Sequence, residues 1–489
     1  MSKILFVTPP YFCWGVQTIG NWPPLMLAYL AGVSVEEGHE TVIYDAMNKH
    51  HSFENIREEI QRFQPDYVMT LDYLPVTGAI STATVPAALK ILDIAKEVNP
   101  SIITLLGGPH PTFMYDEILG DKQNHVDYLL MGEPEQTLRH LLSAIPEGTA
   151  KSVKGIAYID EGKVVANERQ THIVELDALN PAWHLLDWDD YQYKITPTGR
   201  MASILTSRGC DMGCAFCSQR LFWRDDWRCR KPENVIKEME HLIDTYQVSY
   251  ITLIDPYPTK HRERWELLMD LLIERKLPVR LLIETRVEDI IRDADILHKY
   301  HDAGIIHVYL GAESGDDDNL NALNKGTGIE QNKQALDLLR EADIMTEASF
   351  MIGFANETWE SVQKNIDAAI YLNPDIAVFP VLTPFPFTPI YNDVKDRIRV
   401  FDYSKYNLVV PIIEPYNMTM EEITQALGMC YMKFYSNKVQ EIVALEEGFK
   451  RTYMLSAFKL MMKDHGEHFD FAGSDMPMHY NTGSAHPGL

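Results

Sequence analysis

The stretch Arg208-Gly209-Cys210-Asp211-Met212-Gly213-Cys214-Ala215-Phe216-Cys217 places three of the six cysteines of this 489-residue chain within eight residues. The spacing, three residues and then two, lets one short loop bring its thiolates to a single inorganic centre, and Gly209 and Gly213 free the backbone to do so. Thiolate ligands in a chain of this size suit zinc or an iron–sulfur cluster. The stretch therefore predicts a metal centre in the middle of the chain.

The number of cysteines in the stretch distinguishes between a zinc ion and an iron–sulfur cluster. Structural zinc sites usually pair two CxxC-like halves, and only one half is present here. Three local cysteines instead leave one iron of a four-iron cluster without a protein ligand, and the spacing resembles that of the radical SAM (S-adenosylmethionine) superfamily. The resemblance implies a [4Fe-4S] cluster on Cys210, Cys214 and Cys217, whose open iron is chelated by SAM before a 5′-deoxyadenosyl radical forms. A zinc knuckle completed by Cys229 or a remote histidine is the alternative.

The composition excludes several classes of protein. Acidic residues outnumber basic ones by 70 to 44, and the resulting formal net charge of −26 argues against a nucleic-acid partner. No run of about eighteen apolar residues is present, so we expect no membrane span. The apolar run at residues 3–7 meets prolines at once, as a first β-strand does and a signal peptide does not. Six cysteines without a secretory signal favour a reducing cytoplasm.

Residues 1–145 alternate short apolar runs with helical patterns, which is typical of a parallel α/β sheet. We expect strands at 3–7, 41–44, 66–71, 101–106 and 127–130, and helices at 23–36, 53–63, 81–97, 111–119 and 134–143. Such a pattern predicts a Rossmann-like, doubly wound domain with its ligand at the carboxyl ends of the strands. No G-x-G-x-x-G follows the first strand, which disfavours a dinucleotide.

A domain of this kind before the cysteine motif resembles the cobalamin-binding domain of the B12-dependent radical SAM enzymes. The resemblance implies a corrin above the strand ends. Its expected contacts are Pro10, Trp22, Asp72, Tyr73, Thr77, Gly107, Gly108, Pro109, Gly132 and Glu133. The D-x-H-x-x-G motif of methionine-synthase-like proteins is absent, so we expect no histidine to replace the dimethylbenzimidazole tail on cobalt. The loop 72–77 would then face the lower side of cobalt. A domain that only packs is the alternative.

Residues 146–200 are expected to connect two domains. Apolar runs at 155–159 and 163–166 flank Asp160-Glu161-Gly162 and predict a hairpin. The aromatic side chains that follow, Trp183, Trp188, Tyr191 and Tyr193, are expected to pack between domains.

Residues 201–385 alternate again, with strands expected at 202–207, 249–254, 279–284, 306–310, 346–352 and 376–382. Helices are expected at 232–246, 260–276, 293–303, 328–341 and 356–372. Six such units predict a partial (β/α)6 barrel, whose chemistry lies at the carboxyl ends of its strands. The cysteine motif follows the first strand, and polar residues follow the others. By resemblance to the superfamily, SAM would be bound by Phe216, Arg286, Glu313, Ser314 and Gly353.

Residues 386–489 are expected to form a helical cap, with helices at 418–436, 439–447 and 451–463. Five segments along the chain resemble the family of anaerobic magnesium-protoporphyrin IX monomethyl ester oxidative cyclases. They are 21–24, 217–225, 285–290, 383–389 and 400–407. The likeness runs to about residue 460. It implies oxidation of a tetrapyrrole side chain with water as the oxygen source.

We therefore expect a cytoplasmic enzyme that uses a [4Fe-4S] cluster, SAM and cobalamin. Its substrate is expected to be a small molecule of the tetrapyrrole class, and its electrons are expected to come from a donor such as flavodoxin or ferredoxin. Two alternatives stay open. One is a cobalamin-dependent radical C-methyltransferase, because Gly311-Ala312-Glu313-Ser314-Gly315 has the general superfamily form. The other is a non-catalytic cobalamin-binding protein with a structural zinc.

Overall fold

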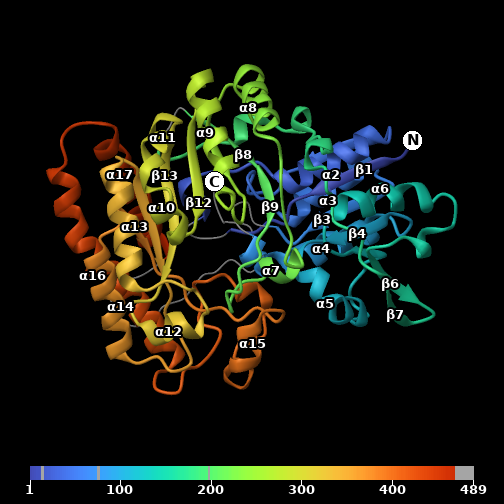
Figure 1. Ribbon diagram of the computed structural model, residues 1–489. Coiled ribbons are helices and arrows are strands. Elements are labelled where there is room, and N and C mark those ends of the chain that lie inside the picture. The colour runs from blue at the N-terminus through green and yellow to red at the C-terminus, as the bar shows by residue number, and fades with distance from the viewer. Residues whose placement is uncertain (13–15, 74–77, 197–198, 469–489) are drawn as a thin grey trace.

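The computed structural model describes residues 1–12, 16–73, 78–196 and 199–468. It has two α/β halves side by side, with the chain passing from the first half to the second near its middle (Figure 1). Among the described residues, no helix is both long enough and apolar enough to cross a lipid bilayer.

The first half is built on a sheet in the order β2-β1-β3-β4-β5-β6-β7. The strands are β1 (Lys3–Val7), β2 (Glu40–Tyr44), β3 (Tyr67–Leu71), β4 (Ile103–Gly107), β5 (Tyr128–Leu130), β6 (Ile156–Asp160) and β7 (Lys163–Ala166). The first five are parallel. The predicted hairpin is present as β6 and β7, and it extends the sheet by antiparallel pairing with β5.

Helices cover both faces of this sheet, which makes the domain doubly wound, as predicted. The cores place α2 (Leu25–Glu36) and α6 (Pro134–Ala144) on one face, and α3 (Phe53–Phe63), α4 (Val85–Val98) and α5 (Pro109–Gly120) on the other. The strand order reverses between β1 and β3, so a ligand crevice is expected outside the carboxyl ends of these two strands. The short α1 (Val16–Ile19) and the turn η1 (Gly78–Thr84) lie in the two loops that follow them.

The second half is a partial barrel whose described strands run β15-β14-β13-β12-β11-β8, all parallel. The strands are β8 (Arg200–Ile204), β11 (Val248–Leu253), β12 (Arg280–Thr285), β13 (Ile305–Glu313), β14 (Met345–Phe350) and β15 (Ile376–Val378). The connecting helices are α8 (Pro232–Tyr246), α9 (Arg262–Arg275), α10 (Val287–Arg292), α11 (Leu297–Asp302), α12 (Asp317–Ala322), α13 (Ile329–Glu341) and α14 (Trp359–Leu372). The predicted barrel order is confirmed.

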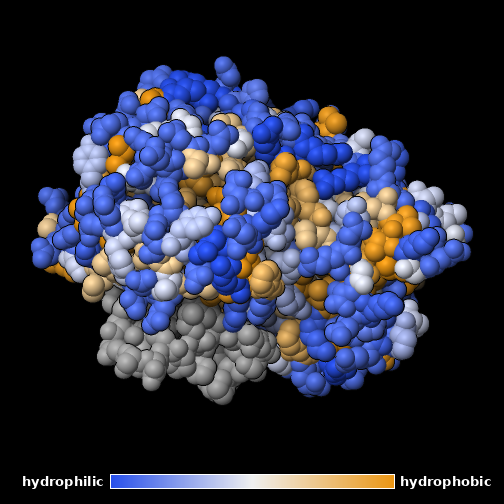
Figure 2. Space-filling model, turned by 90° about the horizontal axis from the view of Figure 1, so that it is seen from below, coloured by the Kyte–Doolittle hydropathy of each residue, from blue (hydrophilic) through white to orange (hydrophobic). Residues whose placement is uncertain are grey.

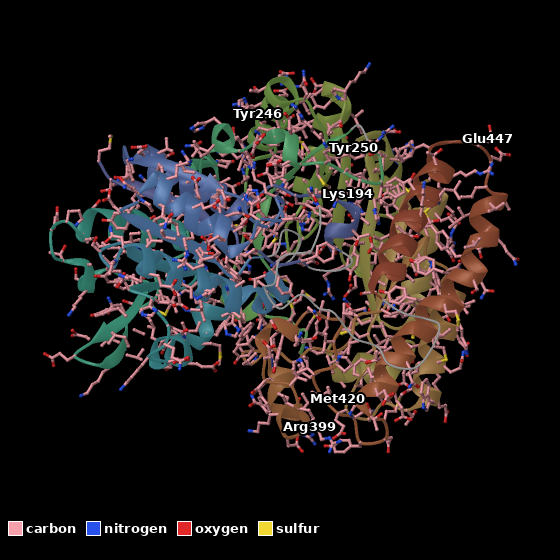
Figure 3. All side chains as sticks on the ribbon, turned by 180° about the vertical axis from the view of Figure 1, so that it is seen from behind. Lys194, Tyr246, Tyr250, Arg399, Met420 and Glu447 are labelled. Carbon is pink, nitrogen blue, oxygen red and sulfur yellow. The ribbon has the colours of Figure 1, made fainter. Side chains whose placement is uncertain are left out.

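The last part of the chain is helical. Two helices, α16 (Met420–Ala444) and α17 (Phe449–His468), cover the edge of the barrel beyond β15. In Figure 3, Met420 marks the first residue of α16 and Glu447 lies just after its last residue, so this helix runs along most of the height of the barrel half. The predicted break at residues 437–438 is wrong. Lys438 is buried and its Nζ bonds to Asn373 and to Glu441, so this charged residue lies inside a continuous helix.

Before α16 the chain returns to the first half. Residues between α15 (Pro389–Val394) and the turn η8 (Tyr403–Lys405) share one core with α2 and α6. The predicted interdomain packing of aromatic residues is confirmed for Trp183, Trp188 and Tyr191, which join α2 to α8 in a single core. The two halves are therefore one packed body (Figure 1).

Candidate functional site

The cysteine loop lies at the junction of the two halves. It begins after β9 (Ser207–Gly209), which pairs with β10 (Trp227–Cys229) in a two-stranded sheet, and it ends at α7 (Gln219–Phe222). Figure 1 shows β9 and α7 between the two halves. Gly209 has φ +102°, and a Cβ there would come within 1.9 Å of the Asp226 carbonyl oxygen, so glycine is required where the loop begins.

Three backbone contacts fix the loop against the barrel. The amide of Ala215 donates to the Leu323 carbonyl at 2.9 Å, and the side-chain amide of Asn324 donates to the Gly213 carbonyl at 2.8 Å. The amide of Ile390 donates to the Ala215 carbonyl at 3.0 Å. The loop is therefore held from both sides before any cofactor binds.

The three thiols of the loop are each partly exposed. Burial and then the charge of Cys214 raise the pKa of Cys210, and burial together with both neighbouring cysteines raises the pKa of Cys217 to about 12. All three thiols come from one eight-residue stretch of this loop. Metal ions must displace their protons, because the thiolate is the ligand.

A zinc site would need a fourth protein ligand beside the three cysteines. In the described part of the chain, no three His, Cys, Asp or Glu side chains converge on a point that one metal ion could occupy. Cys229, the suggested fourth zinc ligand, is exposed on β10 opposite Ser207.

Arg286 stands next to the cluster loop. Its Nη1 lies 4.0 Å from the Cys214 sulfur, and its Nη2 donates to the Lys325 carbonyl at 3.1 Å and also contacts Glu288. The remaining guanidinium surface faces the loop, where it can bind the carboxylate of an amino acid.

Glu313 is the last residue of β13, Ser314 follows it, and both are buried. Glu313 has φ 64°, and its carboxylate accepts from Lys325 Nζ at 2.7 Å and from Ser349 Oγ at 3.1 Å. A Cβ on Gly311 would clash with both charged groups of this ion pair, which explains the glycine. Ser314 Oγ accepts the Asp316 amide at 3.1 Å.

Gly353 and Phe216 complete the predicted SAM set. Gly353 has φ +83°, and its amide donates to the Glu357 carboxylate at 2.7 Å. Phe216 is partly buried against the core that joins the two halves. Arg286 and Glu313 both contact Lys325, and Gly353 lies three residues beyond β14, whose Ser349 bonds Glu313. The structure thus gathers these predicted side chains at neighbouring strand ends.

The predicted cobalamin residues divide into two groups. Pro10, Gly132 and Pro109 border the strand ends, and a Cβ on Gly132 would meet nothing within 4 Å, so its backbone is open. Trp22 and Tyr73 are buried between the halves: the Trp22 indole donates to Thr252 Oγ1 at 3.2 Å, and the Tyr73 hydroxyl donates to the Pro23 carbonyl at 3.1 Å. Thr77 lies outside the described residues.

Asp72 occupies the space that the paired glycines leave. Its Oδ2 accepts from the His110 amide at 2.8 Å and from Ser81 at 2.9 Å, while its Oδ1 would lie 1.6 Å from a Cβ on Gly108. A Cβ on Gly107 would contact Leu71. Burial raises the pKa of the Asp72 carboxyl well above its usual value.

Two buried polar atoms at this edge have no partner among the described residues, Asp72 Oδ1 and His110 Nε2. Burial lowers the pKa of His110 to about 3, so its ring is neutral. Orphaned polar atoms beyond β3 and β4 and an open glycine backbone beyond β5 fit a polar ligand bound over the strand ends.

Glu133 lies elsewhere, in a buried ion-pair network. It accepts from Arg208 Nη1 at 3.0 Å and from Arg228 Nη1 at 2.9 Å, and Arg208 Nη2 donates to Glu135 at 2.6 Å. Arg208 directly precedes the cysteine loop, so this network ties that loop to the first domain. Sequence reasoning missed Arg208, Glu135 and Lys325 because their partners are distant in the chain.

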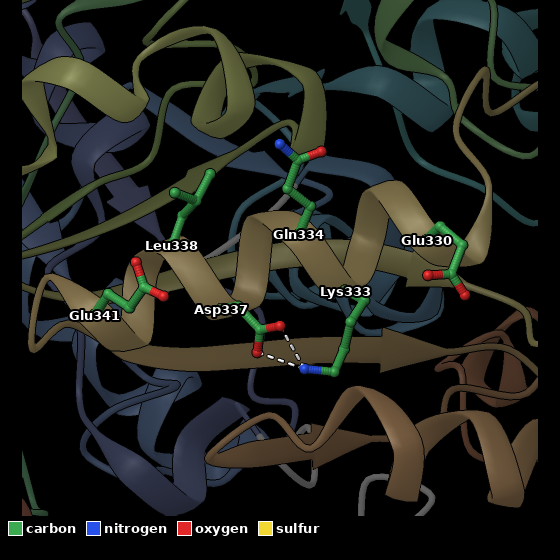
Figure 4. Close-up of a pocket in the computed structure, with 6 residues that line it drawn as sticks. All are labelled: Glu330, Lys333, Gln334, Asp337, Leu338 and Glu341. Atoms are coloured by element: carbon green, nitrogen blue, oxygen red, sulfur yellow. Dashed lines mark hydrogen bonds and ion pairs between the residues drawn. The ribbon is translucent and has the colours of Figure 1, made fainter.

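A shallow hollow along α13 has no such chemistry. It is lined by Glu330, Lys333, Gln334, Asp337, Leu338 and Glu341, all from one helix, and Lys333 pairs with Asp337 (Figure 4). Such i,i+4 pairs are ordinary features of a solvated helix.

Comparisons with known proteins agree with this geometry. The family model of the radical SAM superfamily matches residues 204–369, and that of the B12 binding domain matches residues 16–142. The chain is 39% identical over 468 residues to the anaerobic magnesium-protoporphyrin IX monomethyl ester cyclase of Rubrivivax gelatinosus, covering 94% of this chain and 82% of that protein. It is 30% identical to the uncharacterized methyltransferase PH0819 of Pyrococcus horikoshii, covering 89% and 93%.

Among solved structures, the fold is similar to that of the radical SAM methyltransferase TsrM from Kitasatospora setae with cobalamin and a [4Fe-4S] cluster bound. The TM-score is 0.67 at 17% identity, covering 96% of this chain and 100% of that chain. At this identity the likeness concerns the fold.

Proposed function

Because the chain belongs to the B12-binding radical SAM enzymes, the family that includes the anaerobic magnesium-protoporphyrin IX monomethyl ester cyclases, we propose that it oxidises a side chain of a magnesium tetrapyrrole and closes a further ring. The observation that carries the proposal is the identity to the Rubrivivax gelatinosus cyclase, which runs through 94% of this chain. When bound, the cluster with SAM supplies a 5′-deoxyadenosyl radical, and cobalamin supplies a second redox centre.

The roles of the residues follow from their positions. Cys210, Cys214 and Cys217 hold the cluster, and the Arg286 guanidinium beside Cys214 binds the carboxylate of SAM. Glu313, oriented by Lys325, and Ser314 bind its methionyl or ribose groups. The backbone of the turn at Gly353 and that of Phe216 accommodate the adenine.

In the first domain, we propose that the corrin lies over the crevice between the ends of β1 and β3. Pro10 follows β1 and Asp72 follows β3, at that crevice. Pro109 and His110 follow the adjacent β4, and Gly132 follows β5, along the same edge of the sheet. Trp22, Tyr73, Gly107, Gly108 and Glu133 support it, because each is buried against other protein groups. The proposal also includes domain limits at residues 145, 200 and 385. It further includes an electron donor such as flavodoxin or ferredoxin and a cytoplasmic location.

A large flat substrate requires an apolar surface between the halves. Seen from below, the surface is mostly hydrophilic over both halves, with apolar residues near their junction (Figure 2). Phe387, Tyr391 and Tyr403, from the segment that returns from the barrel, are partly buried against the core that joins the two halves. Aromatic rings are suited to contact a macrocycle.

The test is anaerobic incubation of the reconstituted protein with magnesium-protoporphyrin IX monomethyl ester, SAM and a reductant in 18O-labelled water. The proposal predicts a product that carries one labelled oxygen and no added methyl group. Methyl transfer, which the identity to PH0819 favours as the second candidate, would instead give a methylated product and S-adenosylhomocysteine.

A further inference from the structure

One level of the barrel interior is lined by acidic side chains. Glu284 on β12, Tyr309 on β13 and Glu347 on β14 are direct neighbours in the sheet register. We call these three residues the luminal row. Successive side chains of a strand point to opposite faces of the sheet. Ile283 and Val308, which directly precede Glu284 and Tyr309, belong to the core beneath the outer helices. The luminal row therefore points into the barrel.

The interior is hollow at this level. All three residues of the luminal row are partly exposed, whereas one level lower Leu282, His307 and Met345 are buried. Tyr193 and Tyr453 are packed with them at the floor. A side chain inside the barrel can contact solvent above such a floor only through the mouth. The hollow thus opens toward the carboxyl ends of the strands.

The mouth of the hollow is the region around the cluster loop. Arg286, which approaches Cys214, lies two residues beyond Glu284 on the same face of the chain, a rise of about 7 Å. On the neighbouring strands, Ser349 donates to Glu313 one level above the luminal row. The luminal row is the next layer below the residues assigned to SAM.

Glu284 has the properties of a group that exchanges protons. It forms no hydrogen bond or ion pair with a described residue, whereas Glu347 Oε2 lies 3.0 Å from His307 Nε2. Burial and then the charge of Glu347 raise the pKa of Glu284 to about 8. The His307 Nδ1 and the Tyr453 hydroxyl, 2.9 Å apart, continue the polar contacts to the floor. The titratable groups that act on this carboxyl are Glu347 and Tyr309 of the same row. Arg286 lies two residues farther along the chain, and Glu313 is paired with Lys325 above the row. His307, Tyr193 and Tyr453 are bonded to one another below it.

We propose that Glu284 accepts the proton released when water adds to the oxidised substrate carbon. This inference rests on the proposed oxidation. In the step, the water oxygen bonds to the carbon, one O–H bond of water breaks, and the proton passes to the carboxylate. The carbon has by then lost one hydrogen atom to the deoxyadenosyl radical and one electron to an oxidant of the corrin class. Radical methyl transfer releases no proton at this stage, so the luminal row favours oxidation.

The test compares Glu284→Gln with the wild type and with Glu274→Gln, an exposed control on α9. The wild-type rate of 18O incorporation is expected to rise with pH and to level off above about 8, because the acceptor must be deprotonated. Glu284→Gln is expected to lose about 10²-fold or more in that rate and to lose the pH dependence. It should still form 5′-deoxyadenosine, since hydrogen abstraction precedes the proton transfer.

A second readout does not depend on turnover. Infrared difference spectra of the cofactor-free protein should show a protonated carboxyl band that disappears near pH 8 and is absent in Glu284→Gln. If Glu284→Gln keeps the wild-type rate and pH profile, or if this band is unchanged in the variant, the inference is wrong. If the wild type itself incorporates no oxygen from water, the proposed oxidation fails and the infrared result still reports the titration of Glu284.

Discussion

Replacing Arg208 with methionine should destabilise the junction between the cysteine loop and the first domain. Arg208, Glu133 and Glu135 have side chains only 2%, 3% and 1% exposed, so their charges are balanced by one another and not by water. Arg208→Met leaves Glu135 without its cation and Glu133 with Arg228 alone. Breaking a buried ion pair by removing one partner costs about 3–5 kcal/mol. We expect a loss of that size in the free energy of unfolding.

Urea unfolding followed by tryptophan fluorescence measures this loss, because Trp183 and Trp188 lie in the interdomain core. The matched control is Arg62→Met, which removes an arginine that is 68% exposed and pairs with Glu59, and it should cost less than about 1 kcal/mol. The double variant Arg208→Met, Glu135→Gln should recover part of the loss, since it removes the uncompensated charge.

The pH dependence follows from the sign of the shift at Glu133. Burial alone would raise its pKa, but the guanidinium groups of Arg208 and Arg228 outweigh burial and lower it. The free energy that this carboxylate contributes to folding is therefore fully present at pH values above the usual pKa of a carboxyl group. It is lost as the pH falls through the lowered pKa of Glu133. The difference in free energy of unfolding between the wild type and Arg208→Met should therefore become smaller at acidic pH. Equal urea midpoints for both proteins at neutral pH would refute the reasoning.

Three further predictions concern single sites. Cys214→Ala should lose the iron that the reconstituted wild type binds, whereas Cys229→Ala should keep it, as measured by elemental analysis; equal iron in both would contradict the assignment. Gly108→Ala should destabilise the first domain by more than about 1 kcal/mol in thermal unfolding, because its φ is +114° and its Cβ would overlap a carboxylate oxygen. Lys325→Met should weaken SAM binding at least about tenfold in calorimetry, since Glu313 is left buried and unpaired.

Much of the fold could be predicted from local patterns. The alternation of apolar runs and helices located every strand of both parallel sheets to within a few residues, because strands buried on both faces must be apolar. The start of α14 was predicted near residue 356, and the structure begins it after Thr358, whose hydroxyl caps the Ser361 amide.

What could not be predicted depends on contacts between distant residues. The run 202–207 was predicted as one strand, but the chain leaves the barrel after Ile204, and β9 pairs with β10. No local signal shows that Lys438 is neutralised inside α16 by Asn373 and Glu441. In the same way, no local signal shows that the Glu133 carboxylate pairs with Arg208 and Arg228.

The central claim is that a cluster with one open iron lies in the same protein as a corrin. It is tested most directly by metal analysis and electron paramagnetic resonance of the anaerobically reconstituted, reduced protein with and without SAM. The account predicts iron and cobalt in the ratio of one four-iron cluster to one corrin, and a cluster signal that changes when SAM is added. Zinc in place of iron, or a cluster signal unaffected by SAM, would contradict it.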